Sequence, residues 1–214
     1  MTTTAPLDRR QRRRQETIDE VLRVAVDVMA EQGVAGLTLG EVARRMGIRP
    51  PSLYVYFDSK HALYDALFER GWTELLGALR EGVTGDDLAD LYAVGEIFVR
   101  WSVEHPAYAP LMHWRPVPGF TPSEAAYAPA VQIATEGREL LRRVLAAGGP
   151  PETDLDRAFR TWTALVSGVI TQQLANAPDE PYETGTFTST LPDLVAMWLA
   201  HYRAAPAPKA EDRP

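Results

Sequence analysis

Residues 38–60 bring together side chains that could hold a nucleic acid. Hydroxyl, ammonium and guanidinium groups donate to phosphate oxygens, and an arginine can also pair with both acceptors of a guanine edge. Proline has no donor, so it can give only apolar contact, for example to a thymine methyl group. The candidate DNA-contacting residues are Thr38, Arg44, Arg45, Arg49, Pro50, Pro51, Ser52, Tyr54, Tyr56 and Lys60.

Each of these candidates also has a structural explanation. The two tyrosines could be core aromatics that cover a small helical bundle, and the two prolines could simply start a helix. Arg44 and Arg45 could belong to a solvated helix face, and Thr38 could be no more than a helix cap. Whether these side chains bind DNA therefore depends on the elements that present them.

The same segment has the pattern of two short helices joined by a tight turn. Thr38 can cap the first helix, and Glu41 follows at the spacing of a capping box. Val42 and Met46 lie four residues apart, so they share one apolar face. Gly47 falls at the turn, where a positive φ angle costs a glycine little. Crossed helices of this kind place the second helix in the major groove of DNA.

The run SLYVYFDSK, from Ser52 to Lys60, leads into a further apolar helical pattern. Over residues 15–70 the order of these parts resembles the tetracycline-repressor (TetR) family of bacterial transcription regulators. The resemblance implies that the start of the second helix faces base edges and that Tyr54 and Lys60 contact the DNA backbone. Gly40 departs from some family members, which place a long polar base-reading residue there, so we expect less base readout from the first crossing helix.

Charge is distributed unevenly along the chain. The 214 residues carry a formal net charge of −7, yet residues 1–60 hold ten Lys and Arg against eight Asp and Glu. A locally basic surface on an acidic body can bind DNA at one face. Near the N-terminus lies a cluster made of Arg9, Arg10, Arg12, Arg13 and Arg14. This cluster could follow a groove or the DNA backbone, or it could do little as a disordered basic tail.

The pattern of the whole chain predicts an all-α protein of about nine helices. Apolar residues recur at intervals of three and four, and no alternating strand pattern is long enough to trust. We expect a basic disordered arm over 1–14, a three-helix DNA-binding domain with the helix-turn-helix over 15–60, a larger helical ligand-binding and dimerisation domain over 61–205, and a disordered tail over 206–214. Four prolines between positions 106 and 120 predict a turn and a loop there.

The C-terminal half is rich in large aromatic residues beside polar groups. The family resemblance implies a small-molecule pocket between the helices of this half, and such pockets are mostly apolar with a few oriented polar groups. Core packing is the competing explanation for most of these aromatics. The candidate ligand-binding residues are Trp101, His105, Tyr108, Met112, His113, Tyr127, Trp162 and Gln173.

The last two helical patterns, over 153–176 and 191–203, carry many apolar residues. In the family these helices pair with those of a second subunit, and internal core is the alternative. A homodimer also follows from geometry, because two recognition helices about 34 Å apart can read two half-sites one turn of DNA apart. The apolar residues concerned are Phe159, Trp162, Val166, Val169, Ile170, Leu194, Val195, Trp198 and Tyr202.

The sequence offers little support for catalysis. The four histidines have no metal-ligand spacing, and there is no nucleophile elbow, Walker A loop or dinucleotide-binding motif. There is no cysteine and no run of 18 apolar residues. We therefore expect no metal, no cofactor, no enzymatic activity and no membrane span, in a cytoplasmic protein.

Together these patterns favour a ligand-responsive DNA-binding transcription regulator, a repressor that a small-molecule effector releases from a double-stranded operator. In the expected mechanism the ligand shifts the angle between C-terminal helices, and the helix over 59–80 transmits the shift. Two other classes stay open. A DNA-binding architectural or accessory protein without a sensor would show little sequence preference. A small-molecule enzyme with a vestigial helix-turn-helix would depend on His105 and His113.

Overall fold

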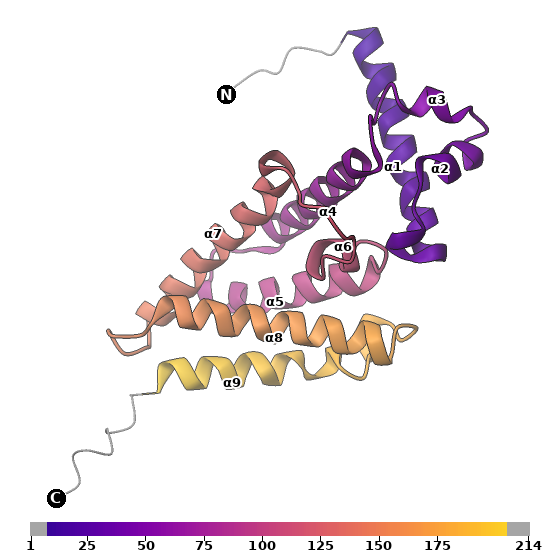
Figure 1. Cartoon of the computed structure of the whole chain (residues 1–214). Helices are drawn as coiled ribbons and strands as arrows, with labels where there is room; N and C mark the ends of the chain where they lie inside the picture. The colour runs from indigo at the N-terminus through magenta and orange to yellow at the C-terminus, as the bar shows by residue number, and fades with distance from the viewer. Residues whose placement is uncertain (1–7, 205–214) are drawn as a thin grey trace, which may run out of the picture. The chain divides into compact units, whose positions relative to one another are not determined.

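The computed structural model describes residues 8–204, and over this range the chain forms nine α-helices and no strand (Figure 1). The all-α prediction is confirmed. The predicted tail over 206–214 lies outside the described residues. The helices are α1 (Arg9–Gly36), α2 (Leu39–Arg45), α3 (Pro50–Leu53), α4 (Lys60–Gly82), α5 (Asp87–Glu104), α6 (Ala109–His113), α7 (Glu124–Ala146), α8 (Leu155–Asn176) and α9 (Leu191–Arg203), with short 3₁₀ turns η1 (Tyr182–Thr184) and η2 (Thr188–Thr190) before α9.

The chain divides into two compact units. The first unit comprises residues 1–71 and 107–127, and the second comprises residues 72–106 and 128–214. Helices α4 and α7 contribute residues to both units, because the divisions fall inside these helices. These packing units have other bounds than the functional domains expected over 15–60 and 61–205, which remain a prediction. None of the helices in residues 8–204 is long and apolar enough to cross a membrane.

Helix α1 begins earlier than the sequence analysis expected. The Asp8 side chain accepts a hydrogen bond from the backbone N–H of Arg10, and the Gln11 side chain accepts one from the N–H of Asp8. These bonds close a capping box on the first turn, and arginine is a good helix former. The expected disorder is therefore wrong for residues 9–14, whose arginines lie on a regular helix. Residues 1–7 lie outside the described range.

In the first unit, helix α2 packs on both α1 and α3. Gly47 has a φ angle of 68° and forms the turn between α2 and α3, as predicted. Val42, on the predicted apolar face of α2, and Leu53 of α3 are both fully buried. The hydroxyl of Tyr64 on α4 donates to the carbonyl oxygen of Val34 at 2.6 Å. This buried bond ties the first half of α4 to the end of α1.

In the second unit, α5, α8 and α9 pack side by side (Figure 1). The rings of Trp162 and Trp198 meet edge to face in the core, with centroids 5.4 Å apart. Most apolar residues expected at a dimer interface are buried inside the single chain, because α5 covers the same faces of α8 and α9. That expectation is wrong, and the internal-core alternative holds, for Trp162, Val166, Val169, Ile170, Val195, Trp198 and Tyr202.

Segment 106–120 contains a helix where the sequence analysis expected a turn and a loop. Helix α6 spans only five residues, and Pro110 occupies its first turn. A proline is tolerated there because the first N–H groups of a helix have no intrahelical partner. The proline count therefore predicted irregular backbone correctly on both sides of α6 and missed the helix itself.

Candidate nucleic-acid interface and ligand cavity

Helix α3 and the turn that follows it present polar groups outward. Leu53 and Phe57 anchor this segment in the core, whereas Tyr54 is 56% exposed and Val55 is 72% exposed. Val55 was not among the candidates, although it stands between two of them in the sequence. Also exposed are the candidates at the start of the helix, Arg49, Pro50, Pro51 and Ser52. The buried pair fixes the segment, so the exposed side chains have a defined direction.

Thr38 caps helix α2. Its hydroxyl accepts a hydrogen bond from the backbone N–H of Glu41 at 3.1 Å. A full capping box would return the Glu41 carboxylate to the backbone of Thr38, but this carboxylate instead accepts from Arg44 at 2.7 Å and from Arg45 at 2.9 Å. These bonds, that from Arg44 first, lower the pKa of Glu41 to about 2. Thr38 is exposed, so capping leaves its DNA contact a prediction.

The two candidate arginines of α2 are occupied by carboxylates. Arg45, whose side chain is 19% exposed, donates to Glu31 of α1 at 2.6 and 2.9 Å as well as to Glu41. Arg44, whose side chain is 70% exposed, forms a two-bonded pair with Glu41. A phosphate contact by either arginine would have to compete with these pairs. Their role on DNA stays a prediction.

Tyr56 and Lys60 also have partners inside the first unit. The guanidinium of Arg14 lies 5.5 Å from the centre of the half-buried Tyr56 ring. The ammonium of Lys60 donates to the carbonyl oxygen of Ala35 at 3.2 Å and lies 5.2 Å from the centre of the Tyr64 ring. Lys60 therefore fastens the start of α4 to the end of α1, whatever it does on DNA.

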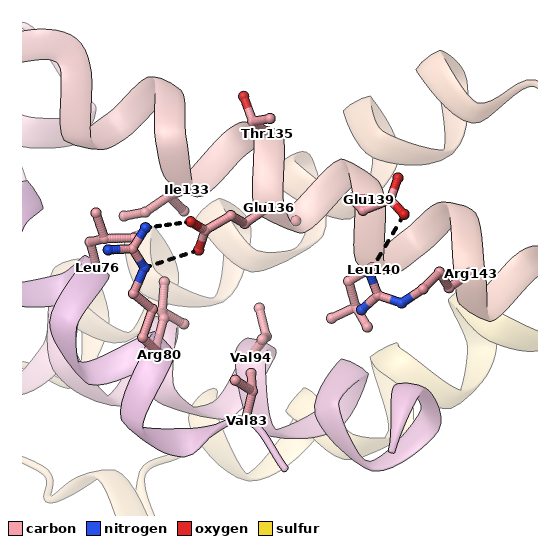
Figure 2. A pocket seen from close by; sticks show the side chains of 12 residues that line it. Leu76, Arg80, Val83, Val94, Ile133, Thr135, Glu136, Glu139, Leu140 and Arg143 are labelled. Atoms are coloured by element: carbon pink, nitrogen blue, oxygen red, sulfur yellow. Dashed lines mark hydrogen bonds and ion pairs between the residues drawn. The ribbon is translucent and has the colours of Figure 1, made fainter. Parts of the chain in front are cut away.

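The second unit contains a cavity of about 390 Å³ between α4, α5 and α7 (Figure 2). Most of its wall is hydrocarbon, supplied by leucine, valine and isoleucine side chains. The lining residues are Leu76, Leu79, Arg80, Val83, Val94, Ile133, Thr135, Glu136, Gly137, Glu139, Leu140 and Arg143.

The charged groups at this cavity are paired with one another or with a neighbour. Figure 2 shows Arg80 of α4 facing Glu136 of α7, with hydrogen bonds of 2.5 and 3.4 Å. Arg143 donates to Asp87 at 2.7 Å and lies 3.7 Å from Glu139. The pKa values of Arg80 and Arg143 are raised, mainly by the bonds to Glu136 and Asp87. The cavity thus offers an apolar surface with compensated charge at its edge.

The predicted ligand-binding residues lie elsewhere. Trp101 stacks on His105 with centroids 4.4 Å apart, and Tyr108 is buried. Trp162 belongs to the core of the second unit. Gln173 is fully buried and hydrogen-bonds the backbone of the loop over 177–188, so its amide has a structural task. None of these residues lines the cavity of Figure 2.

Three predicted residues come together at a smaller cavity of about 170 Å³ in the first unit. Met112, His113 and Tyr127 line it together with Phe68 and Phe120. The Tyr127 ring stacks on Phe68 with centroids 5.8 Å apart. Burial lowers the pKa of His113 to about 4, so its imidazole is neutral at pH 7. A small aromatic or apolar group would suit this lining.

One sequence feature, an excess of apolar residues on and after α4, could have indicated the larger cavity. Helix α4 carries Leu75, Leu76 and Leu79, which spread over more of the helix surface than one narrow apolar stripe. Val83, just after α4, is exposed although apolar. Such an excess indicates apolar surface that the helix does not bury fully, but it does not reveal which other helices face it.

The first unit thus contains a helix-turn-helix whose second helix is exposed, and the second unit contains an apolar cavity. Residues 21–67 match the family described as bacterial regulatory proteins, tetR family, and residues 91–208 match the tetracyclin repressor-like C-terminal domain. The chain belongs to the tetracycline-repressor family, as the motif over residues 15–70 indicated.

Individual relatives agree with this assignment. The transcriptional repressor KstR2 of Rhodococcus jostii is 32% identical over 161 residues, which cover 68% of this chain and 76% of the relative. The class A tetracycline repressor from transposon 1721 of Escherichia coli is 49% identical over 49 residues, 23% of each chain. A solved structure of a protein of unknown function from Rhodococcus sp. RHA1 has a TM-score of 0.73 and 20% identity, over 87% of this chain and 95% of that one. Several curated relatives match over less than half of their own length.

Proposed function

We propose that this chain is a ligand-responsive DNA-binding transcription regulator, and that it is a repressor released from its operator by a small molecule. The observation that carries the proposal is the outward placement of α3 and its following turn above the buried Leu53. Family membership supports the regulatory role, and one relative is named a transcriptional repressor. Such a regulator acts where the DNA lies, in the cytoplasm, and needs no enzymatic activity.

The larger cavity supports an apolar effector. A pocket of a few hundred Å³ lined mostly by hydrocarbon side chains is typical of small-molecule sites. Because Arg80 and Arg143 already face carboxylates, a charged ligand would have to displace an existing ion pair. A neutral, predominantly apolar molecule displaces none. The smaller cavity beside His113 and Tyr127 is the second candidate position, and three of the ligand-binding residues predicted from the sequence line it.

Helix α4 can connect effector and DNA because it is covalently continuous. Leu76, Leu79 and Arg80 in its second half line the larger cavity, while Tyr64 in its first half is bonded to α1. An effector that displaces the second half of α4 would therefore act on the helix that enters the DNA-binding unit. The effector must prefer the DNA-incompetent state, and coupling of about 1–3 kcal/mol is typical.

A dimer through the outward faces of α8 and α9 would present two copies of α3, each with its following turn, to one operator. These faces carry exposed small residues, Ala164 and Gly168 on α8 and Ala196 and Ala200 on α9, beside Met197, which is 67% exposed. Small side chains let two helices approach closely. Met197→Glu should convert the dimer to a monomer in light scattering, whereas the exposed control Val83→Glu should not. A monomeric unsubstituted protein would contradict this part of the proposal.

The proposal is tested by selecting bound duplexes from random DNA and measuring their affinity by fluorescence anisotropy. We expect a two-fold symmetric operator. Arg49→Ala should weaken its binding and change its preferred bases, whereas Arg142→Ala at an exposed position of α7 should do neither. An apolar effector should weaken operator binding, and N-phenyl-1-naphthylamine, a neutral apolar fluorophore, can first report whether the cavity is accessible.

The other classes predict different results. An architectural or accessory protein would select no consistent sequence, and no compound in an apolar panel would change its affinity. An enzyme with a vestigial helix-turn-helix would bind no DNA, and its turnover of a small molecule would be lost in His105→Ala or His113→Ala. Either result would overturn the repressor proposal.

A further inference from the structure

The first unit has a groove that contains one candidate DNA-contacting residue, Tyr56, and is otherwise lined by residues outside that candidate list. It lies between the first two turns of α1 and the turn after α3, and it measures about 630 Å³. The α1 groove is lined by Asp8, Arg9, Arg10, Arg13, Arg14, Thr17, Val55 and Tyr56. Four of its eight residues are arginines, so it is strongly cationic.

Within residues 8–204, the guanidinium groups of Arg9, Arg10, Arg13 and Arg14 form no ion pair with a carboxylate. They differ in this from arginines such as Arg45 and Arg80, which carboxylates hold. Asp8 is the single acid in the groove, and its carboxylate caps the backbone of α1. Concentrated positive charge without an internal partner attracts an external anion.

The spacing of the arginines suits a chain of anions. Arg9 and Arg10 lie on one helical turn, and Arg13 and Arg14 lie on the next, about 5.4 Å further along the axis. All four reach the same groove. Two tiers of guanidinium groups can each take a separate phosphate of one strand, whereas a single small anion would engage only one tier.

The groove is continuous with the surface that faces DNA in the proposed function. Tyr56 and Val55 form its other wall, and both belong to the turn that directly follows α3. Arg14 lies over the ring of Tyr56, which places this guanidinium beside that turn. A duplex held at α3 would thus pass close to the α1 groove, and the segment nearest the groove would be its backbone.

We propose that the α1 groove binds the DNA backbone beside the segment that α3 reads, with Arg13 and Arg14 each neutralising a phosphate. This inference rests on the proposed function and extends the interface beyond α2 and α3. The contacts add affinity equally for every sequence, because phosphate contacts carry no base information. They also make α1 the main source of the salt dependence of binding, since Arg44 and Arg45 already have carboxylate partners.

The test compares a double variant, Arg13→Gln with Arg14→Gln, with a control of equal charge change, Arg23→Gln with Arg142→Gln. Arg23 and Arg142 lie near carboxylates of their own helices, Asp27 and Glu139. Operator affinity is measured between 50 and 200 mM KCl. The slope of log K against log salt should become shallower by about 1.8 in the Arg13/Arg14 variant, at roughly 0.9 for each lost phosphate contact. The control should keep the slope of the unsubstituted protein.

A trimmed duplex localises the effect. On an operator cut back to the bases that α3 protects, the Arg13/Arg14 variant and the unsubstituted protein should bind alike, because the flanking phosphates are gone. Circular dichroism and thermal melting check that both variants keep the fold. An unchanged salt slope on the full operator would overturn the inference while leaving the repressor proposal standing.

Other results separate the remaining explanations. If the unsubstituted protein selects no operator at all, the proposed function itself fails. If a fluorescent polyglutamate peptide binds the unsubstituted protein and loses binding in the Arg13/Arg14 variant while the DNA salt slope stays the same, the groove serves an acidic protein partner and the DNA assignment is wrong.

Discussion

The α1 groove of the first unit and the apolar cavity of the second unit use arginine in opposite ways. In the groove, Arg13 and Arg14 form no ion pair with a carboxylate of residues 8–204 and line an open polar surface. At the cavity, Arg80 and Arg143 face Glu136 and Asp87, and the remaining wall is hydrocarbon. The same residue type therefore points to an external anion in one place and to bracing between helices in the other.

The physical difference lies in which carboxylates the fold brings within reach. An ion pair already satisfies a guanidinium, so an incoming anion must displace a partner to gain the same bond. A guanidinium without such a partner gives its full attraction to the incoming anion. Charge alone, counted along the sequence, does not distinguish these two situations. Each of the following experiments changes residues in one of the two units, so that the results can be compared.

The largest effect is expected in the packed core of the second unit. Trp162→Ala should lower the free energy of unfolding by about 3–5 kcal/mol, because a large aromatic that meets Trp198 leaves a void. Urea unfolding measures the change. Trp114→Ala is the matched control, since Trp114 is exposed and a surface substitution usually changes stability by less than about 0.5 kcal/mol. Equal effects of both substitutions would mean that Trp162 is not core.

Filling the larger cavity with a bulky side chain should weaken ligand binding there. Val94→Trp places a large ring where Val94 lines the wall, and binding of N-phenyl-1-naphthylamine should weaken at least tenfold, about 1.4 kcal/mol. Operator affinity without ligand should stay the same. The control is Leu88→Trp, an exposed position of the same helix α5. Undiminished fluorophore binding in Val94→Trp would place the apolar site elsewhere, with the cavity beside His113 as the next candidate.

Substituting an arginine that has a carboxylate partner should mainly lower stability, whereas substituting one that has none should mainly lower DNA affinity. Arg45→Gln removes the cation that joins Glu31 of α1 to Glu41 of α2, so its melting temperature should fall further than that of Arg14→Gln. Arg14→Gln should instead show the larger loss of operator affinity at low salt. Differential scanning calorimetry and anisotropy give the two quantities. The opposite ranking would remove the distinction between the two kinds of arginine.

The smallest effect concerns pH. The pKa of Glu41 is about 2 in the folded chain against an ordinary value of 4.5. A carboxyl with a lowered folded pKa stabilises the fold fully above its unfolded pKa, and this contribution disappears as the pH falls from about 4.5 to about 2. The stability difference between the unsubstituted protein and Glu41→Gln, from urea midpoints, should therefore shrink across that window. A difference independent of pH would contradict the Arg44 and Arg45 pairs.

The fold followed from local patterns that the sequence displays directly. The helices could be predicted because apolar residues recur at intervals of three and four. Gly47 predicted the turn between α2 and α3, where its φ angle is 68°. The exposed start of α3 could also be predicted, since Leu53 and Phe57 are the apolar residues that anchor it. The early start of α1 was missed because a run of arginines suggests disorder, although Asp8 and Gln11 form a capping box.

The contacts of the candidate sites could not be predicted in the same way. Glu31 and Arg45 are 14 residues apart, and Arg80 and Glu136 are 56 apart, so their pairing depends on how whole helices pack. The cavity wall combines residues of α4, α5 and α7 for the same reason. Large aromatic residues beside polar groups suggested Trp162 and Gln173 for a ligand site, yet Trp162 packs in the core and Gln173 holds a loop.

Residue type and spacing were thus enough to establish the helices, the helix-turn-helix and the family, because these depend on neighbours a few positions away. Long-range packing decided which arginines of residues 8–204 have no carboxylate partner and which apolar side chains line the cavity. Charge compensation and cavities are properties of groups that meet in space, and the order of residues along the chain does not contain their distances.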